Sequence, residues 1–287
     1  SQTTTVRDYF LEIGLYKSPQ PFGLDTMLGS GTGLGIGRGV VSRPQQGRVR
    51  TRHHTKADSC LPANLSGENR KTLRMDRGMS TSRLTCRSCS SNRIESVLDF
   101  GEIPLANALL SVEQLRKPEV TYPLEFVFCR DCTLAQITET VPPECLFREY
   151  LYFSAISETV VQNARDITHR MRERLNLGER SQVVEIASND GYLLQHYVEK
   201  GIPVLGIEPA QNVVSVAMQR GIRTLPEFFD EPLAKRLSAE GLLADVIHAN
   251  NVVAHVANLH GVVEGIGRLL KPDGVAVVED HYVRDLI

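Results

Sequence analysis

Two Cys-x-x-Cys pairs constrain this chain more than any other feature of its sequence. Cys86 and Cys89 form the first pair, Cys129 and Cys132 form the second, and 39 residues separate the two. A two-residue spacing lets one tight turn present both sulfur atoms to a single tetrahedral ion, and two such turns complete a four-thiolate shell. A closed shell leaves no position for water. We therefore expect a structural Zn²⁺ site.

The segment between the pairs has to bring them together. Residues 98–101 and 123–128 have the composition of β-strands, which predicts a small β-structure around the metal. Paired thiols of this spacing are typical of a reducing compartment. The sequence shows neither a signal peptide at its start nor an apolar run long enough to span a membrane. These features favour a cytoplasmic protein without a membrane partner.

The first 78 residues differ in composition from the rest. They carry a charge of +6, against −8 for residues 79–287, and lack a sustained helical or strand period. Such a segment buries too little apolar surface to offset chain entropy, so we expect a disordered or non-native extension that precedes a start at Met79. The glycines of residues 29–37 imitate a dinucleotide-binding loop, but no strand precedes them, which favours a linker. The net negative charge of residues 79–287 does not suggest a nucleic-acid surface.

Buried β-type runs alternate with helical stretches from residue 155 onward. This order predicts an α/β fold with a doubly wound, mostly parallel sheet. We expect a zinc-binding domain over 79–150 and this second domain over 151–287. The expected strands are 182–186, 203–207, 244–248 and 274–278, and the expected helices are 157–177, 191–200, 211–220, 231–240 and 257–270.

Ligands of such sheets bind beyond the carboxyl ends of the strands. Glu185 closes the first expected strand and can accept a hydrogen bond from a cationic amino group. Glu208 closes the second and can accept from both hydroxyls of a ribose. The cofactor-binding candidates are completed by residues of the turn after the first strand and by one at the end of the third: Ala187, Asn189, Gly191 and Asn250.

The charge of this turn discriminates between two cofactors. A nicotinamide dinucleotide needs glycines around its pyrophosphate, but the turn contains Ala187 and Asn189 and adds the negative charge of Asp190. S-adenosylmethionine has no phosphate and carries a sulfonium and an ammonium group. An acidic, glycine-poor turn therefore favours S-adenosylmethionine.

Five further segments resemble one family. Residues 147–154, 184–194, 206–210, 249–256 and 270–274, together with the cysteine pairs, are similar to the zinc-containing, S-adenosylmethionine-dependent sugar C-methyltransferases. The resemblance implies a Rossmann-like class I methyltransferase domain and a nucleotide-linked 4-keto-deoxysugar as substrate. It also implies the reaction: a base removes the proton next to the keto group, and the enolate takes the methyl group.

The catalytic candidates carried over from the resemblance are Tyr150, Tyr152 and His255. His255 also follows the end of an expected strand, whereas His260 is off that face and receives no role. The resemblance implies that the catalytic base belongs to the family's Tyr-His-Glu-His segment, which, like the family's C-terminal domain, would follow Ile287. We therefore expect this chain to bind the cofactor but to turn over a keto-deoxysugar poorly or not at all. The alternatives are an O- or N-methyltransferase, or a zinc- and cofactor-binding fragment without turnover.

Overall fold

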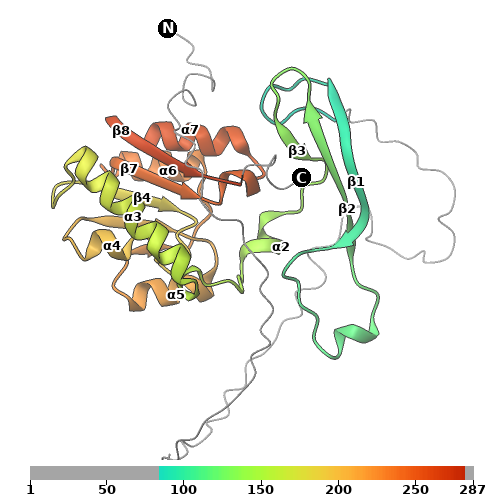
Figure 1. The fold of residues 1–287 in the computed structure, drawn as a ribbon, viewed down its shortest axis with the longest axis horizontal. Coiled ribbons are helices and arrows are strands. Elements are labelled where there is room, and N and C mark those ends of the chain that lie inside the picture. The colour runs from blue at the N-terminus through green and yellow to red at the C-terminus, as the bar shows by residue number, and fades with distance from the viewer. Residues whose placement is uncertain (1–83, 282–287) are drawn as a thin grey trace, which may run out of the picture.

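A computed structural model describes residues 84–281, which form two separate sheets (Figure 1). The expected extension over 1–78, its glycine-rich run and the start at Met79 lie outside the described residues. The domain boundaries drawn from the sequence stay predictions. Figure 1 shows the short helix α2 (Pro143–Phe147) in the connection between the two sheets.

The first sheet is antiparallel and has the order β1-β2-β3. It consists of β1 (Ile94–Pro104), β2 (Thr121–Cys129) and β3 (Ala135–Ile137), with the 3₁₀ turn η2 (Gln114–Arg116) between β1 and β2. The two strands expected between the cysteine pairs correspond to parts of β1 and β2. The pairing of Ile94 with Cys129 brings the start of β1 beside the second cysteine pair.

The second sheet is parallel throughout and has the order β6-β5-β4-β7-β8. The strands are β4 (Val183–Ile186), β5 (Val204–Ile207), β6 (Thr224–Leu225), β7 (Ala244–Asn250) and β8 (Leu270–Glu279). All four expected strands are present, and the expected α/β class with a parallel sheet is confirmed. The two-residue strand β6 was not expected, because it is too short to show a period.

Helices cover both faces of this sheet. They are α3 (Glu158–Leu175), α4 (Gln195–Val198), α5 (Gln211–Gln219), α6 (Glu231–Ala239) and α7 (Leu259–Leu269), with the 3₁₀ turns η3 (Ser154–Ile156) and η4 (Val253–His255). Val184 and Ile186 pack in one core with residues of α6 and α7, whereas Val183 packs in a second core with residues of α3, α4 and α5. Because side chains alternate along a strand, Glu185 belongs to the same face as Val183.

Among the described residues, no helix is long and apolar enough to cross a membrane. The carboxyl ends of the parallel strands form one edge of the sheet. Most of the residues that the sequence proposes for the cofactor and the reaction lie along this edge.

Candidate functional site

The two cysteine pairs sit in turns of matching geometry. In the first, the Ser90 N–H donates to the Cys86 carbonyl at 2.9 Å, and the Cys86 N–H donates to the Ser91 carbonyl at 2.8 Å. The second turn repeats these bonds from Thr133 to Cys129 and from Cys129 to Leu134, both at 2.9 Å. Ser90 and Thr133 both adopt positive φ, 59° and 64°. Each turn therefore presents its two sulfur atoms in the same way.

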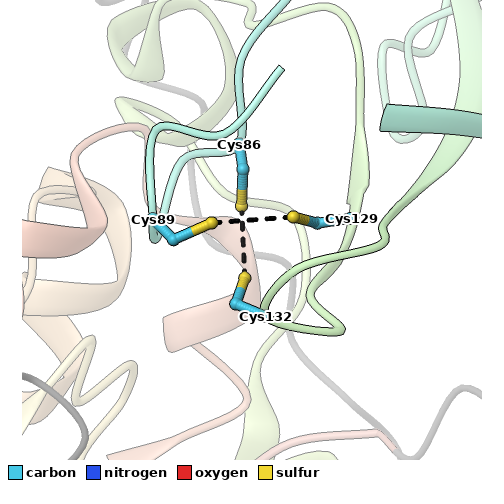
Figure 2. A group of neighbouring side chains, drawn as sticks. All are labelled: Cys86, Cys89, Cys129 and Cys132. Atoms are coloured by element: carbon cyan, nitrogen blue, oxygen red, sulfur yellow. Dashed lines mark hydrogen bonds between the residues drawn. The ribbon is translucent and has the colours of Figure 1, made fainter. Parts of the chain in front are cut away.

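The four sulfur atoms converge (Figure 2). All lie within 4.8 Å of one another, with Cys86 Sγ 3.4 Å from Cys132 Sγ and Cys89 Sγ 3.6 Å from Cys129 Sγ. Tetrahedral zinc with Zn–S bonds of about 2.3 Å requires sulfur atoms roughly 3.8 Å apart. The spacing fits the closed zinc shell that the sequence predicts.

The two thiols of the second pair differ in acidity. Backbone N–H donors, first that of Cys132, lower the pKa of the Cys129 thiol to about 7. Burial instead raises the pKa of Cys132 to about 12. The opposite directions reflect backbone donors at Cys129 and burial at Cys132.

The turn after β4 has an unusual backbone. Ala187, Asn189 and Gly191 all adopt positive φ, at 54°, 49° and 78°. A Cβ atom on Gly191 would lie 2.2 Å from Ile222 Cδ1. Both this close contact and the positive φ favour glycine at this position. Gly206 of β5 also packs tightly, because a Cβ atom there would lie 2.4 Å from Ser188 Oγ. The close packing fixes the turn against β5.

We call the parallel sheet and the helices that cover it the sheet domain. Glu185 lies inside this domain rather than at its surface. Its side chain is 1% exposed, and Oε2 has no hydrogen-bond partner among the described residues. Burial, with the charges of Glu208 and Asp190, raises its pKa well above the usual range. A buried acceptor of this kind is costly unless a donor reaches it. The ammonium group that the sequence assigns to Glu185 is such a donor.

Glu208 follows β5 and connects two backbone segments. Its Oε2 accepts from the Asn189 N–H at 3.0 Å, and its Oε1 accepts from the Ala210 N–H at 2.9 Å. Burial raises its pKa, and these two donors partly oppose that rise. Each oxygen retains a second lone pair for a ligand hydroxyl. The carboxylate is thus held in place and still able to accept from a ribose.

Tyr150 and Tyr152 lie in a segment, 150–154, which we call the strap. The Asn212 side chain accepts from the Tyr150 N–H at 3.1 Å and donates to the Tyr150 carbonyl at 2.6 Å. Asn189 donates to the Tyr152 carbonyl at 3.0 Å and accepts from the Ser154 N–H at 3.0 Å. The strap is therefore tied to the turn after β4 and to α5, beside the predicted cofactor site.

The two tyrosines differ in their surroundings. Burial raises the pKa of Tyr150, and the nearby charge of Glu208 adds to the rise. Its ring centroid lies 6.1 Å from that of Phe147. Tyr152 is 46% exposed. A role for either tyrosine stays a prediction.

The remaining candidates follow β7. Asn250 is 9% exposed, its Oδ1 lacks a partner among the described residues, and its Nδ2 donates to Glu279 Oε2 at 3.4 Å. His255 ends η4 and is exposed. The six cofactor candidates thus lie at the carboxyl ends of three neighbouring strands, β5, β4 and β7, or in the loops that follow them. His255 lies on the loop that follows Asn250.

Three residues with structural roles at these sites were not expected. Asn212 and Glu279 anchor the strap and the end of β7, as described above. His260, which the sequence left without a role, makes a 2.8 Å hydrogen bond through Nε2 to the carbonyl oxygen of Ser88, inside the first cysteine turn. These are contacts to distant segments, for which the sequence carries no local signal.

Comparison with known proteins agrees with both parts of the structure. Residues 86–147 match the family model described as "Putative zinc binding domain", and residues 156–286 match the one described as "Methyltransferase domain". The parallel sheet with its acidic edge and the four-cysteine shell therefore define an S-adenosylmethionine-dependent methyltransferase domain and a zinc-binding domain. Within this chain a zinc-binding domain is thus followed by a methyltransferase domain.

The most informative relative is the C-methyltransferase NovU of Streptomyces niveus. It is 33% identical over 202 residues, which cover 70% of this chain and 48% of that protein. A ubiquinone biosynthesis O-methyltransferase of Bartonella bacilliformis is 26% identical over 98 residues, 34% of this chain and 40% of its own length. The chain thus spans about half the length of these relatives.

Solved methyltransferases overlap only with part of the chain. CalS10, an amino pentose methyltransferase from Micromonospora echinaspora, is 21% identical and covers 47% of this chain and 59% of its own, with a TM-score of 0.34. The plantazolicin methyltransferase BpumL is 13% identical over 43% of this chain and 48% of its own, with a TM-score of 0.37.

Proposed function

We propose that the chain takes part in S-adenosylmethionine-dependent C-methylation of a nucleotide-linked 4-keto-deoxysugar. The main support is the extent of the similarity to the C-methyltransferase. Its 202 residues exceed the 131 residues of the methyltransferase match, so the similarity reaches into the zinc-binding domain. The match to the O-methyltransferase spans only 98 residues. The reducing cytoplasm suits the four thiolates and is the compartment we propose.

In this proposal the acids at the sheet edge bind the cofactor. Glu185 accepts from the ammonium group, since its Oε2 is buried without a partner. Glu208 accepts from the ribose hydroxyls, and the turn over 187–191 brings its backbone close to the ligand. Asn250 offers its unpartnered Oδ1. When bound, the cofactor supplies an electrophilic methyl group.

The reaction itself requires a base that forms an enolate of the bound sugar. A base takes the proton from the carbon next to the sugar's keto group, and the electron pair of that C–H bond forms the enolate. The enolate carbon would take up the methyl group that S-adenosylmethionine would supply. Within the described residues His255 is the candidate base, because it is exposed on the loop after Asn250. Tyr150 and Tyr152 line the site from the strap.

Cofactor binding is tested by calorimetry with S-adenosylmethionine. Glu208→Ala removes two charge-assisted hydrogen bonds to the ribose, each worth about 1.5–3 kcal/mol, and should weaken binding more than tenfold. Glu227→Ala is the matched control, since Glu227 is an acid near the same edge that pairs with Arg236 on the surface. Equal affinity of both variants and the parent chain would refute the assignment.

The substrate and the base are tested by exchange of the sugar's α-proton with deuterated solvent. We expect any exchange of this proton in a nucleotide-linked 4-keto-deoxysugar to be slow in this chain, and His255→Gln should slow it further. Exchange at an unchanged rate in His255→Gln would place the base elsewhere. Methylation of a hydroxyl or amino group without any α-proton exchange would favour the O- or N-methyltransferase alternative.

A further inference from the structure

The carboxyl end of β8 carries two consecutive acids that bind the loop after β7. Asn250 Nδ2 and Asn251 Nδ2 donate to the two oxygens of Glu279, at 3.4 and 3.3 Å. The Asn251 N–H donates to the Glu279 carbonyl at 2.6 Å, and the Ala254 N–H donates to Asp280 Oδ2 at 3.3 Å. Four hydrogen bonds thus join 279–280 to 250–254.

These bonds begin where the β-ladder stops. The last pair of the ladder between β7 and β8 is Asn250 with Glu279. Asn251 then turns the chain with a positive φ of 54°, and η4 follows directly. Beyond this point the loop makes backbone hydrogen bonds within η4, and the Asp280 side chain links it to the end of β8. The side chains of Glu279 and Asp280, at the end of β8, therefore hydrogen-bond to the residues that lead to His255.

A third element converges on the same carboxylate. Asn163 of α3 donates through Nδ2 to Glu279 Oε2 at 3.2 Å. Glu279 therefore accepts from three side-chain amides, which come from α3 and from the end of β7. A carboxylate held from two directions is fixed relative to the sheet. It can act as a rigid support for the loop.

We propose that Glu279 and Asp280 are positioning residues, which hold segment 250–254 and thereby set the place of His255 at the sheet edge. The proposal rests on the proposed function, in which His255 takes part in the reaction. Asp280 has a second link to this loop: burial raises its pKa, while the nearby His255 and His281 lower it. Its Oδ1 is buried without a partner among the described residues.

Two pairs of variants separate the hydrogen bonds from the charge. Asp280→Ala removes the acceptor for the Ala254 N–H, whereas Asp280→Asn keeps an oxygen that accepts from it. Glu279→Ala removes both side-chain acceptors, whereas Glu279→Gln keeps one. Asp99→Ala is the control, because Asp99 also accepts a backbone N–H, that of Gly101 at 2.8 Å, but in the first sheet.

Amide hydrogen exchange over 250–256 gives the first readout. Asp280→Ala should exchange roughly fivefold faster there, as expected for one lost hydrogen bond, and Glu279→Ala, which loses three, should exchange at least as fast, while Asp280→Asn stays near the parent rate. The imidazole NMR signal of His255 should shift in the two alanine variants, and that of His169 should not. Unchanged exchange, or faster exchange with an unmoved His255 signal, would overturn the proposal.

A kinetic readout distinguishes this proposal from the proposed function. Asp280→Ala should lower kcat for α-proton exchange roughly 10- to 100-fold by misplacing the base, with KM and cofactor affinity near the parent values. Recovery in Asp280→Asn supports positioning through the hydrogen bond. A parent chain that binds no S-adenosylmethionine would refute the proposed function, whereas the amide exchange and the His255 signal still decide on Glu279 and Asp280.

Discussion

The zinc-binding part and the sheet domain are stable for different reasons. Between residues 84 and 137 only four apolar or cysteine side chains are buried, Cys86, Tyr122, Val127 and Cys129, and two of them are zinc ligands. Phe100 and Leu109 are 58% and 82% exposed. In the sheet domain every residue of β4 is buried, and two apolar cores flank the sheet. We therefore expect the first part to need its metal to fold, whereas the second has a core of its own.

Removal of one zinc ligand should separate the two parts most clearly. A structural zinc site contributes roughly 10–16 kcal/mol of folding free energy, far more than the small buried core of this part can supply. We expect Cys86→Ser to lose the metal and to unfold β1 and β2 while β4 and β7 keep slow amide exchange. Elemental analysis and hydrogen exchange by mass spectrometry measure both effects.

Ser88→Ala is the control for this change, since it alters the same turn without removing a sulfur atom. Two results would contradict the comparison. One is a Cys86→Ser protein that retains protected strands in the first sheet. The other is a protein whose parallel sheet unfolds as well.

A glycine substitution should affect only the sheet domain. Gly206→Ala places a Cβ atom 2.4 Å from Ser188 Oγ and 3.0 Å from Thr224 Oγ1, inside a packed core. We expect a loss of about 3 kcal/mol in the free energy of unfolding, at the upper end of overpacking effects. Urea denaturation followed by circular dichroism measures it. Gly178→Ala, with open space around the new atom, should be close to neutral.

Mild acid should weaken the sheet domain through His248. This side chain is fully buried against Tyr197, 2.9 Å from its hydroxyl, and burial lowers its pKa to about 3. The unfolded chain takes up a proton near pH 6.5 and the folded chain does not, so stability falls as the pH drops below 6.5. Between pH 7 and 5 the loss should be about 2 kcal/mol.

The comparison of the parent with His248→Gln isolates this effect. Every other titrating group, including Glu185 and the cysteines, contributes equally to both proteins. The parent should lose stability toward pH 5 more steeply than the variant, as measured by urea titration at each pH. Parallel curves for the two proteins would show that His248 accepts a proton in the folded state.

The smallest expected effect concerns the contact between the two parts. His260→Ala removes the hydrogen bond to the Ser88 carbonyl and should cost about 1 kcal/mol. We expect faster exchange of amides in the first cysteine turn, with zinc content and cofactor affinity unchanged. His169→Ala, which removes an exposed partner of Glu173, should not alter these amides. Loss of zinc in His260→Ala would mean that the sheet domain helps to form the metal site.

The sequence predicted the features that follow local rules. The cysteine spacing indicated the metal shell, and periodicity indicated the strands of the parallel sheet and its helices. The sequence could not indicate the structural roles of Asn212, Glu279 or His260, because each of them hydrogen-bonds to a segment that is distant along the chain. Glu185 shows the same limit: its place at a strand end was predicted, but its complete burial depends on packing by α3 and α4.

The contact of His260 with Ser88 also bears on how the two parts meet. A single hydrogen bond would not hold separate molecules together, since an affinity even in the millimolar range requires about 4 kcal/mol. Here the connection through α2 keeps both partners on one chain, at an effective concentration that short tethers set in the millimolar range. At that concentration a bond worth about 1 kcal/mol is formed only a small part of the time, so it biases the arrangement of the two parts without locking it. The same two parts, expressed as separate polypeptides and mixed, would remain apart.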